Sequence, residues 1–207
     1  MEKKYAAIAF SKAVREMQEK AGSRNSYARM EKILHEDGLT ENETAFIALQ
    51  DSFYMATIGQ NDYPYIQHRG GPKGFLKILD NKRIGFIDFY GNKQFISAGN
   101  LAEHNKVAII MIDYPSRTRL KLYARGEVVE LKGNEDLYEQ LKPAEYNFRA
   151  SSMMIFHVDA YDWNCPQHIT RRYTLEDIEA FFVSQQNRIE DLEKQIADLK
   201  RGASFKE

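Results

Sequence analysis

Hydrophobic and polar positions alternate along most of the middle of the chain. The alternation is longest in residues 119–130, where the predicted inward face carries Leu120, Leu122 and Ala124. A period of two residues is typical of strands with one buried face. It predicts β-strands in six segments: residues 52–59, 63–69, 84–90, 107–114, 119–130 and 153–162.

The connections between these segments favour an antiparallel arrangement. Gln60, Asn61 and Asp62 form a short turn that joins the first two predicted strands into a hairpin. Only short helices fit between the later strands, so the pattern predicts a mainly β (α+β) chain with a six-stranded antiparallel barrel rather than a parallel α/β sheet. The segment from Glu130 to Ser152, with a helix at 135–141, is predicted to be a surface insertion.

The first part of the chain has helical periodicity. Residues 6–20 are predicted to form one amphipathic helix, and residues 27–35 a second one. Thr40 with Glu43 three positions later forms a capping-box pattern, which predicts a helix through Leu49. We therefore assign residues 1–44 to an N-terminal helical extension and residues 45–170 to the barrel domain.

The C-terminal part, residues 174–201, is predicted to be one long amphipathic helix that begins at a Thr174 cap with Asp177 at the third position. Its seam residues recur at alternating spacings of three and four, with one polar member: Leu175, Ile178, Phe182, Gln185, Ile189, Leu192, Ile196 and Leu199. This is a heptad pattern of nearly four repeats. Two interpretations remain open, a helix packed on its own barrel or a helix paired with that of a second subunit.

Composition restricts the class of partner. The 207 residues carry a formal net charge of −1, which gives no electrostatic reason to expect binding to nucleic acid or to a membrane surface. No apolar run approaches the roughly 20 residues that span a bilayer, and the N-terminus lacks the apolar core of a secretory signal. The single cysteine cannot form an internal disulfide. We therefore expect a cytoplasmic protein.

The segment from Gly91 to Leu101 carries the clearest candidate chemistry. It lies between an apolar strand and a short predicted helical turn at residues 101–105, and it contains Lys93 and small polar side chains. A glycine-containing turn before a helix N-terminus offers free backbone N–H groups to an anion such as phosphate. The alternative is a solvated turn with an exposed lysine.

A second segment combines a strand with a glycine-rich basic loop. Residues 64–75 read P-Y-I-Q-H-R-G-G-P-K-G-F. Alternation along the strand places Gln67 and Arg69 on one face and His68 on the other.

These blocks occur with three others in a definite order: D-S-F-Y at 51–54, M-I-D-Y-P at 111–115 and W-N-C-P-Q-H-I at 163–169. Together they resemble the flavin-nucleotide-binding proteins related to pyridoxamine 5′-phosphate oxidase, over roughly residues 45 to 170. The resemblance implies an FMN-binding split barrel and a homodimer with FMN near the interface. No metal is expected, because Cys165 and His168 lack the remaining ligands of a structural zinc site. The resemblance also implies the following cofactor-binding residues: Gln67, His68, Arg69, Asn92, Lys93, Gln94, Ser97, Asn100, Arg119, Trp163 and Gln167.

Two positions depart from the family pattern. Lys93 stands where arginine is more frequent, which keeps the charge but loses the bidentate fork, and Phe95 stands where tyrosine is usual. By resemblance the block from Trp163 to His168 borders the flavin or substrate pocket. Cys165 has no partner cysteine, so a dithiol cycle is excluded and a buried thiol is expected.

The resemblance implies an FMN-dependent oxidoreductase acting on an unknown small molecule, with no catalytic residue assigned. The alternative is a flavin carrier, store or sensor without turnover. Activity as a pyridoxamine 5′-phosphate oxidase itself is not expected, because the block after residue 163 differs from the substrate-phosphate block of those oxidases.

Overall fold

The computed structural model describes residues 5–32, 37–164 and 166–203. It divides into two units, which are described separately. The first comprises the described parts of residues 1–113 and 118–166, and the second those of residues 114–117 and 167–207. No helix in the described part of the chain is both long and apolar enough to cross a membrane.

Four helices precede the sheet: α1 (Tyr5–Ala9), α2 (Lys12–Lys20), α3 (Arg24–Met30) and α4 (Glu41–Ala48). The single helix predicted for residues 6–20 is therefore wrong. The helix is interrupted at Ser11, which adopts an extended backbone and caps α2 by accepting a hydrogen bond from the Val14 amide. Residues 33–36, the end of the second predicted helix, lie outside the described residues.

The capping box before α4 is confirmed. The Glu43 carboxylate accepts hydrogen bonds from the backbone N–H and the hydroxyl of Thr40. Glu43 is only 3% exposed, so the cap also anchors α4 against the barrel.

The described residues form a seven-stranded antiparallel sheet in the order β2-β1-β5-β6-β7-β4-β3. Its strands are β1 (Ser52–Ile58), β2 (Pro64–Gly70), β3 (Lys77–Ile78), β4 (Arg83–Phe89), β5 (Lys106–Asp113), β6 (Thr118–Val129) and β7 (Ala150–Asn164). A 3₁₀ turn, η1 (Gln60–Asp62), closes the β1–β2 hairpin. Six of the strands match the predicted ones, and the additional strand is the two-residue β3.

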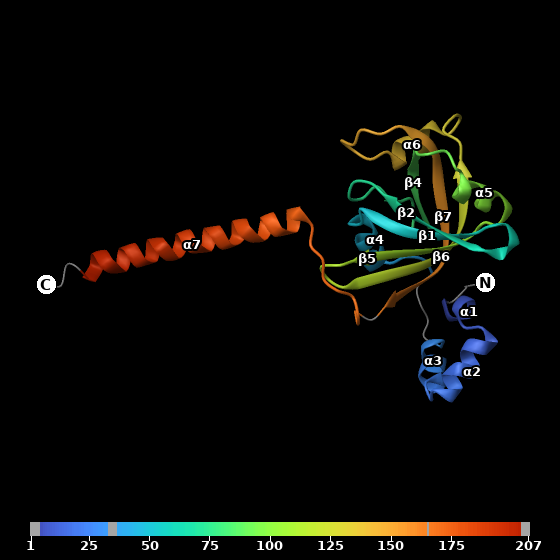
Figure 1. Ribbon diagram of the computed structural model, residues 1–207, viewed down its shortest axis with the longest axis horizontal. Helices are drawn as coiled ribbons and strands as arrows, with labels where there is room; N and C mark the ends of the chain where they lie inside the picture. The colour runs from blue at the N-terminus through green and yellow to red at the C-terminus, as the bar shows by residue number, and fades with distance from the viewer. Residues whose placement is uncertain (1–4, 33–36, 165, 204–207) are drawn as a thin grey trace. The chain divides into compact units, whose positions relative to one another are not determined.

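The sheet curves around one core. In Figure 1, β4 and β7 run across the direction of β1, β5 and β6. Phe53 of β1 and Phe86 of β4 meet edge to face across the interior, with ring centroids 5.4 Å apart. The predicted inward residues Leu120 and Leu122 are at most 1% exposed. The chain therefore has the mainly β barrel architecture that the alternation predicted.

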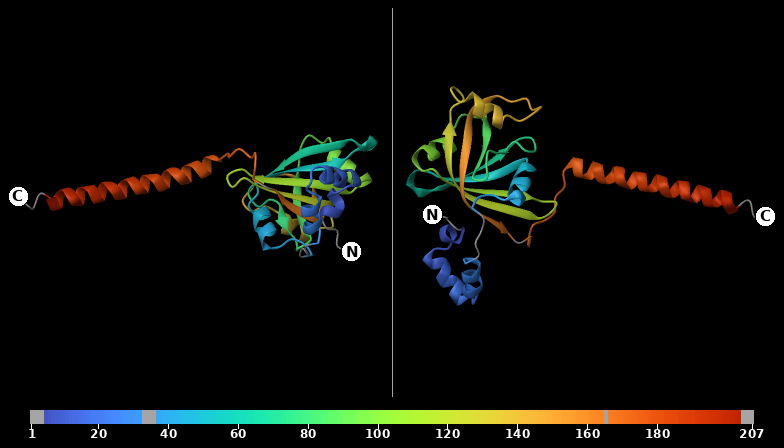
Figure 2. Two further views of the ribbon diagram at one scale, coloured as in Figure 1. Left: turned by 90° about the horizontal axis from the view of Figure 1, so that it is seen from below. Right: turned by 180° about the vertical axis from the view of Figure 1, so that it is seen from behind.

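Helix α5 (Ile96–Glu103) lies between β4 and β5, and α6 (Glu135–Leu141) lies in the predicted insertion. Figure 2 shows helices α1–α3 grouped together beside the barrel. In the second unit, α7 (Leu175–Ala203) begins after Thr174, whose hydroxyl accepts from the Asp177 amide while the Asp177 carboxylate accepts from the Thr174 amide.

Candidate functional site

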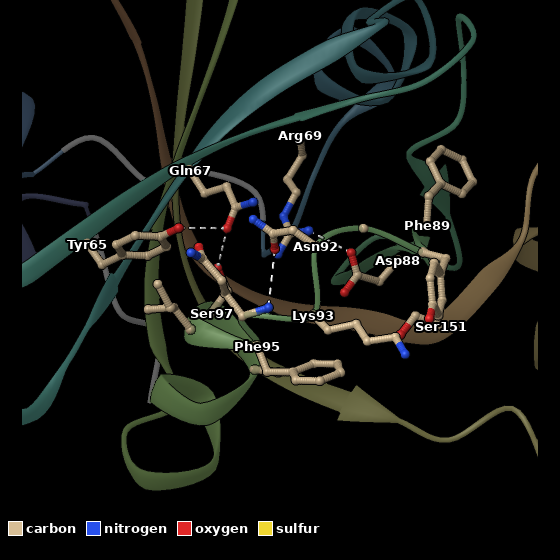
Figure 3. Close-up of a pocket in the computed structure, with 15 residues that line it drawn as sticks. Tyr65, Gln67, Arg69, Asp88, Phe89, Asn92, Lys93, Phe95, Ser97 and Ser151 are labelled. Carbon is tan, nitrogen blue, oxygen red and sulfur yellow. Dashed lines mark hydrogen bonds and ion pairs between the residues drawn. The ribbon is translucent and has the colours of Figure 1, made fainter.

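A small pocket of about 80 Å³ opens beside strands β2 and β4, which lie toward opposite ends of the sheet order. Its walls come from both strands, from the loop after β4, from the start of α5 and from Ser151 of β7 (Figure 3). The lining residues that carry hydrogen-bonding or charged side chains are Tyr65, Gln67, Arg69, Asp88, Tyr90, Asn92, Lys93, Gln94, Ser97 and Ser151.

Strand β2 contributes alternate residues to this pocket. Tyr65, Gln67 and Arg69 line it, as the period of two predicts. His68 points to the opposite face, where its ring meets Tyr54 of β1 edge to face at 5.4 Å between centroids. The structure therefore places His68 outside the pocket.

Gln67 connects β2 to α5. Its side-chain oxygen accepts hydrogen bonds from the Tyr65 hydroxyl at 3.0 Å and from the Ser97 hydroxyl at 3.2 Å. Ser97 is 2% exposed, so its end of this contact is buried. Because the oxygen is occupied, the side-chain NH₂ group of Gln67 is the part that can donate to a ligand.

Arg69 and Asp88 form an ion pair in the pocket wall, with 2.6 Å between Nη1 and Oδ1. Burial raises the pKa of the Asp88 carboxyl, and the Arg69 charge opposes that rise. The Nε atom of Arg69 is buried and has no hydrogen-bond partner among the described residues. Arg69 thus neutralises Asp88 and keeps a donor for a further acceptor.

The loop after β4 makes a tight turn toward α5. Lys93 and Phe95 both adopt left-handed backbone angles, with φ of 62° and 51°. The Asn92 side chain stabilises this turn by accepting a hydrogen bond from the Gln94 amide at 3.2 Å. The ammonium of Lys93 lies 5.1 Å from the centroid of the Tyr90 ring, which holds a cation at the pocket edge.

Helix α5 begins directly at the pocket. It starts at Ile96, five residues before the helical turn predicted at Leu101, because the left-handed Phe95 ends the loop there. The first backbone N–H groups of a helix have no partner within the helix and carry a partial positive charge. Together with Lys93 and Arg69, they make this pocket rich in donors and suited to an anion.

Asn100, also on α5, lies outside the pocket. Its side-chain NH₂ donates to the Thr57 hydroxyl of β1 at 2.9 Å. Thr57 is fully buried, so Asn100 fixes α5 to the barrel. The segment 91–101, predicted as one phosphate-binding segment, is therefore divided between a turn that lines the pocket and a helix face that packs on the sheet.

Trp163 lies at a different cavity. Its Nε1 donates to the Glu43 carboxylate at 2.5 Å, and its ring meets Phe46 of α4 edge to face. It lines a cavity of about 1000 Å³ between the N-terminal helices and β6 and β7, which also includes Lys121 and Tyr161. Trp163 therefore anchors α4 to β7 and does not line the donor-rich pocket.

Two further residues predicted to bind the cofactor, Arg119 and Gln167, do not line the donor-rich pocket. Arg119 lies near the start of β6, paired in register with Ile112 of β5. Gln167 lies in a turn of the second unit. Cys165 lies outside the described residues.

Sequence reasoning missed four polar residues of the pocket: Tyr65, Asp88, Tyr90 and Ser151. Tyr65 shares a face with Gln67 and follows from the alternation of β2. Asp88 ends an apolar run, and its partner Arg69 is 19 residues away in the chain. Ser151 comes from β7, and no motif associates it with β2 or α5.

No curated protein sequence matches the chain. Among solved structures, HupZ of Group A Streptococcus is 12% identical, with 65% of this chain and 100% of that chain covered and a TM-score of 0.49. An FMN-binding protein of Syntrophomonas wolfei is 15% identical, with 72% and 97% covered and a TM-score of 0.45.

A third structure, of a Clostridium acetobutylicum protein related to general stress protein 26, is 15% identical, with 66% and 93% covered and a TM-score of 0.43. The family model described as pyridoxamine 5′-phosphate oxidase matches residues 39–161, which contain every strand of the sheet except the end of β7. The chain therefore belongs to the pyridoxamine 5′-phosphate oxidase family.

Proposed function

We propose that this protein is an FMN-binding flavoprotein whose pocket beside α5 holds the 5′-phosphate of the cofactor. The observation that carries the proposal is the convergence of the α5 N-terminus, the Lys93 ammonium and the Arg69 Nε, which has no hydrogen-bond partner among the described residues. A phosphate needs several donors and a positive field, and this pocket supplies both. The residues present therefore fit the phosphate group.

The dimensions of the pocket also support a phosphate site. About 80 Å³ is far below the roughly 300–1,000 Å³ of pockets that enclose a whole small-molecule ligand. The rim carries exposed apolar surface, because Phe95 is 61% exposed, and Tyr90 and Ile96 are each 39% exposed. The ring system of FMN would extend over this rim, and we propose that a second copy of the chain covers its other side.

In this arrangement each residue of the pocket has a separate task. Lys93 and Arg69 would hold the phosphate, while Gln67 would donate from its NH₂ group to a neighbouring acceptor of the cofactor. Ser97 keeps the Gln67 amide in one orientation through its hydroxyl. The bound flavin itself would supply the redox chemistry. We propose an oxidoreductase acting on a small molecule.

The test compares FMN with riboflavin, which lacks the phosphate, by quenching of flavin fluorescence. Loss of a charge-assisted contact costs roughly 1.5–3 kcal/mol. Lys93→Ala should therefore weaken FMN binding about 10- to 100-fold and leave riboflavin binding nearly unchanged. Lys132→Ala is the matched control, since Lys132 is exposed and lies outside the pocket. Equal weakening of both ligands by Lys93→Ala would refute the phosphate assignment.

The absorbance spectrum of the purified protein, followed by anaerobic titration with NADH and NADPH, separates an oxidoreductase from a carrier or store. An oxidoreductase that uses nicotinamide should lose its flavin absorbance at about one equivalent of donor. A flavin that dithionite reduces and that neither nicotinamide reduces would favour the carrier, store or sensor.

A further inference from the structure

Within the second unit, helix α7 carries an exposed apolar stripe. The seven apolar residues of the heptad seam defined above are between 40% and 78% exposed. The helix is continuous from Leu175 to Ala203, and the reciprocal Thr174–Asp177 hydrogen bonds fix its start. A continuous stripe of this length needs a covering surface, because single exposed apolar residues are ordinary but a contiguous row is not.

The positions along the stripe indicate which surface covers it. In heptad notation the a positions are Leu175, Phe182, Ile189 and Ile196, and the d positions are Ile178, Gln185, Leu192 and Leu199. The last two heptads have isoleucine at a and leucine at d. That combination favours parallel pairs of helices over trimers and tetramers, because β-branched side chains fit the a layer of a two-stranded coiled coil.

Gln185 distinguishes parallel from antiparallel pairing. In a parallel, in-register pair, the d residue of one helix faces the same residue of the other, so the two Gln185 amides can hydrogen-bond to each other. In an antiparallel pair a d residue faces an a residue, and every a residue of this helix is apolar. An antiparallel pair would therefore leave the Gln185 amide buried without a partner, which is costly.

The charges beside the seam agree with this orientation. In parallel coiled coils a g residue lies near the e residue five positions later on the other helix. Arg188 is at g and Glu193 is at e, so each parallel dimer contains two such pairs of opposite charge. The next g–e pair, Gln195 with Lys200, contains no like charges.

We propose that α7 pairs with α7 of a second copy of this chain, as a parallel, in-register two-stranded coiled coil. The residues that carry this proposal all lie in α7, between Leu175 and Lys200. The paired tail would bring two barrels into one molecule.

Cysteine crosslinking in the full chain tests the register. In a Cys165→Ser background, Gln185→Cys places a thiol at a d position, where it faces its own counterpart within disulfide reach. Mild oxidation should give covalent dimers. Asp191→Cys, at the outward-facing c position, is the matched control and should crosslink far less. Equal crosslinking at both positions, or none at residue 185, would overturn the proposal.

A charge-swap series tests the orientation without cysteines. Arg188→Glu and Glu193→Arg each place like charges at both g–e pairs, and each should raise the dimer dissociation constant on the order of tenfold. The double variant Arg188→Glu/Glu193→Arg restores opposite charges and should return the constant close to that of the unchanged chain. Analytical ultracentrifugation measures all four proteins. If the free-energy costs of the two single substitutions simply added in the double variant, the result would contradict the parallel pairing.

Discussion

Arg69 of β2 and Asp88 of β4 are joined by an ion pair of 2.6 Å although their strands share no backbone ladder in the sheet. The two strands lie toward opposite ends of the sheet order, so this side-chain contact links the two ends of the sheet. Both side chains are largely buried, with 15% and 16% exposure. Stability and the donor-rich pocket therefore depend on the same two residues.

Arg69→Met should destabilise the protein by roughly 1–3 kcal/mol at neutral pH, because it leaves the Asp88 carboxylate buried without its counter-charge. Burial raises the pKa of Asp88 in the folded state, so the folded protein binds a proton more readily than the unfolded chain. The stability that protonation of Asp88 contributes is therefore fully present below the unfolded pKa and is lost as pH rises through the folded pKa. Urea unfolding at about pH 7 and about pH 5 should show a smaller loss at the lower pH.

Arg83→Met is the control for this prediction. Arg83 pairs with Asp80 at 2.7 Å, but the two side chains are 49% and 41% exposed. A surface pair of this kind contributes about 0–1 kcal/mol. If the two arginine variants lost the same stability at both pH values, the buried pair would have no special role.

Glu43→Gln should lower stability near neutral pH by roughly 1–3 kcal/mol, since it disturbs the hydrogen bonds from Thr40 and Trp163. Burial alone would raise the pKa of Glu43, but these hydrogen bonds outweigh it and lower the pKa. The stability from a lowered carboxyl pKa is present above the unfolded pKa and disappears as pH falls through the folded one. The difference between the two proteins should therefore shrink in acid.

Fluorescence of Trp163 follows this transition directly, because it is the only tryptophan of the chain. Denaturation curves for both proteins at about pH 7 and about pH 4 give the required comparison. A constant difference at both pH values would show that the charge of Glu43 is not responsible.

We expect a homodimer in solution, with a mass by light scattering of about twice the 24.1 kDa of one chain. Truncation after Tyr173 removes α7 and the apolar surface that would be buried by pairing. The shortened protein should dissociate at a higher concentration than the full chain. A full-length monomer that retains flavin would contradict both the shared cofactor site and the paired tail.

We expect no steady oxidation of pyridoxamine 5′-phosphate. A dianionic substrate needs cationic partners of its own besides those proposed for the cofactor phosphate. The first arginines after β7 are Arg171 and Arg172, and Arg172 lies 4.8 Å from the centroid of the Tyr114 ring. The assay follows pyridoxal 5′-phosphate and peroxide under air. Turnover on the order of 1 per second would establish the oxidase activity.

Local sequence determined the secondary structure wherever the signal and its cause lay within a few residues. The Thr40–Glu43 capping box, the β1–β2 hairpin and helix α6 all follow from neighbouring side chains and turn residues. The same holds for the pocket faces of Gln67 and Arg69, because alternation along a strand is a property of the backbone.

Contacts between distant segments were decided only by the tertiary structure. Strand β3 is two residues long and exists because β4 pairs with it. The helix break at Ser11 and the early start of α5 at Ile96 depend on backbone angles that hydrophobic periodicity does not reveal.

The sites show the same division. Lys93 and the turn around it were visible in the sequence as a local motif, whereas Asp88 and Ser151 join the pocket only when the curved sheet brings β4 and β7 beside β2. Trp163 begins a polar motif in the sequence, yet its indole N–H donates a hydrogen bond to Glu43, 120 residues earlier in the chain. Local periodicity sets which way a side chain points, and the closure of the sheet, driven by burial of its inner face, sets which side chain it meets.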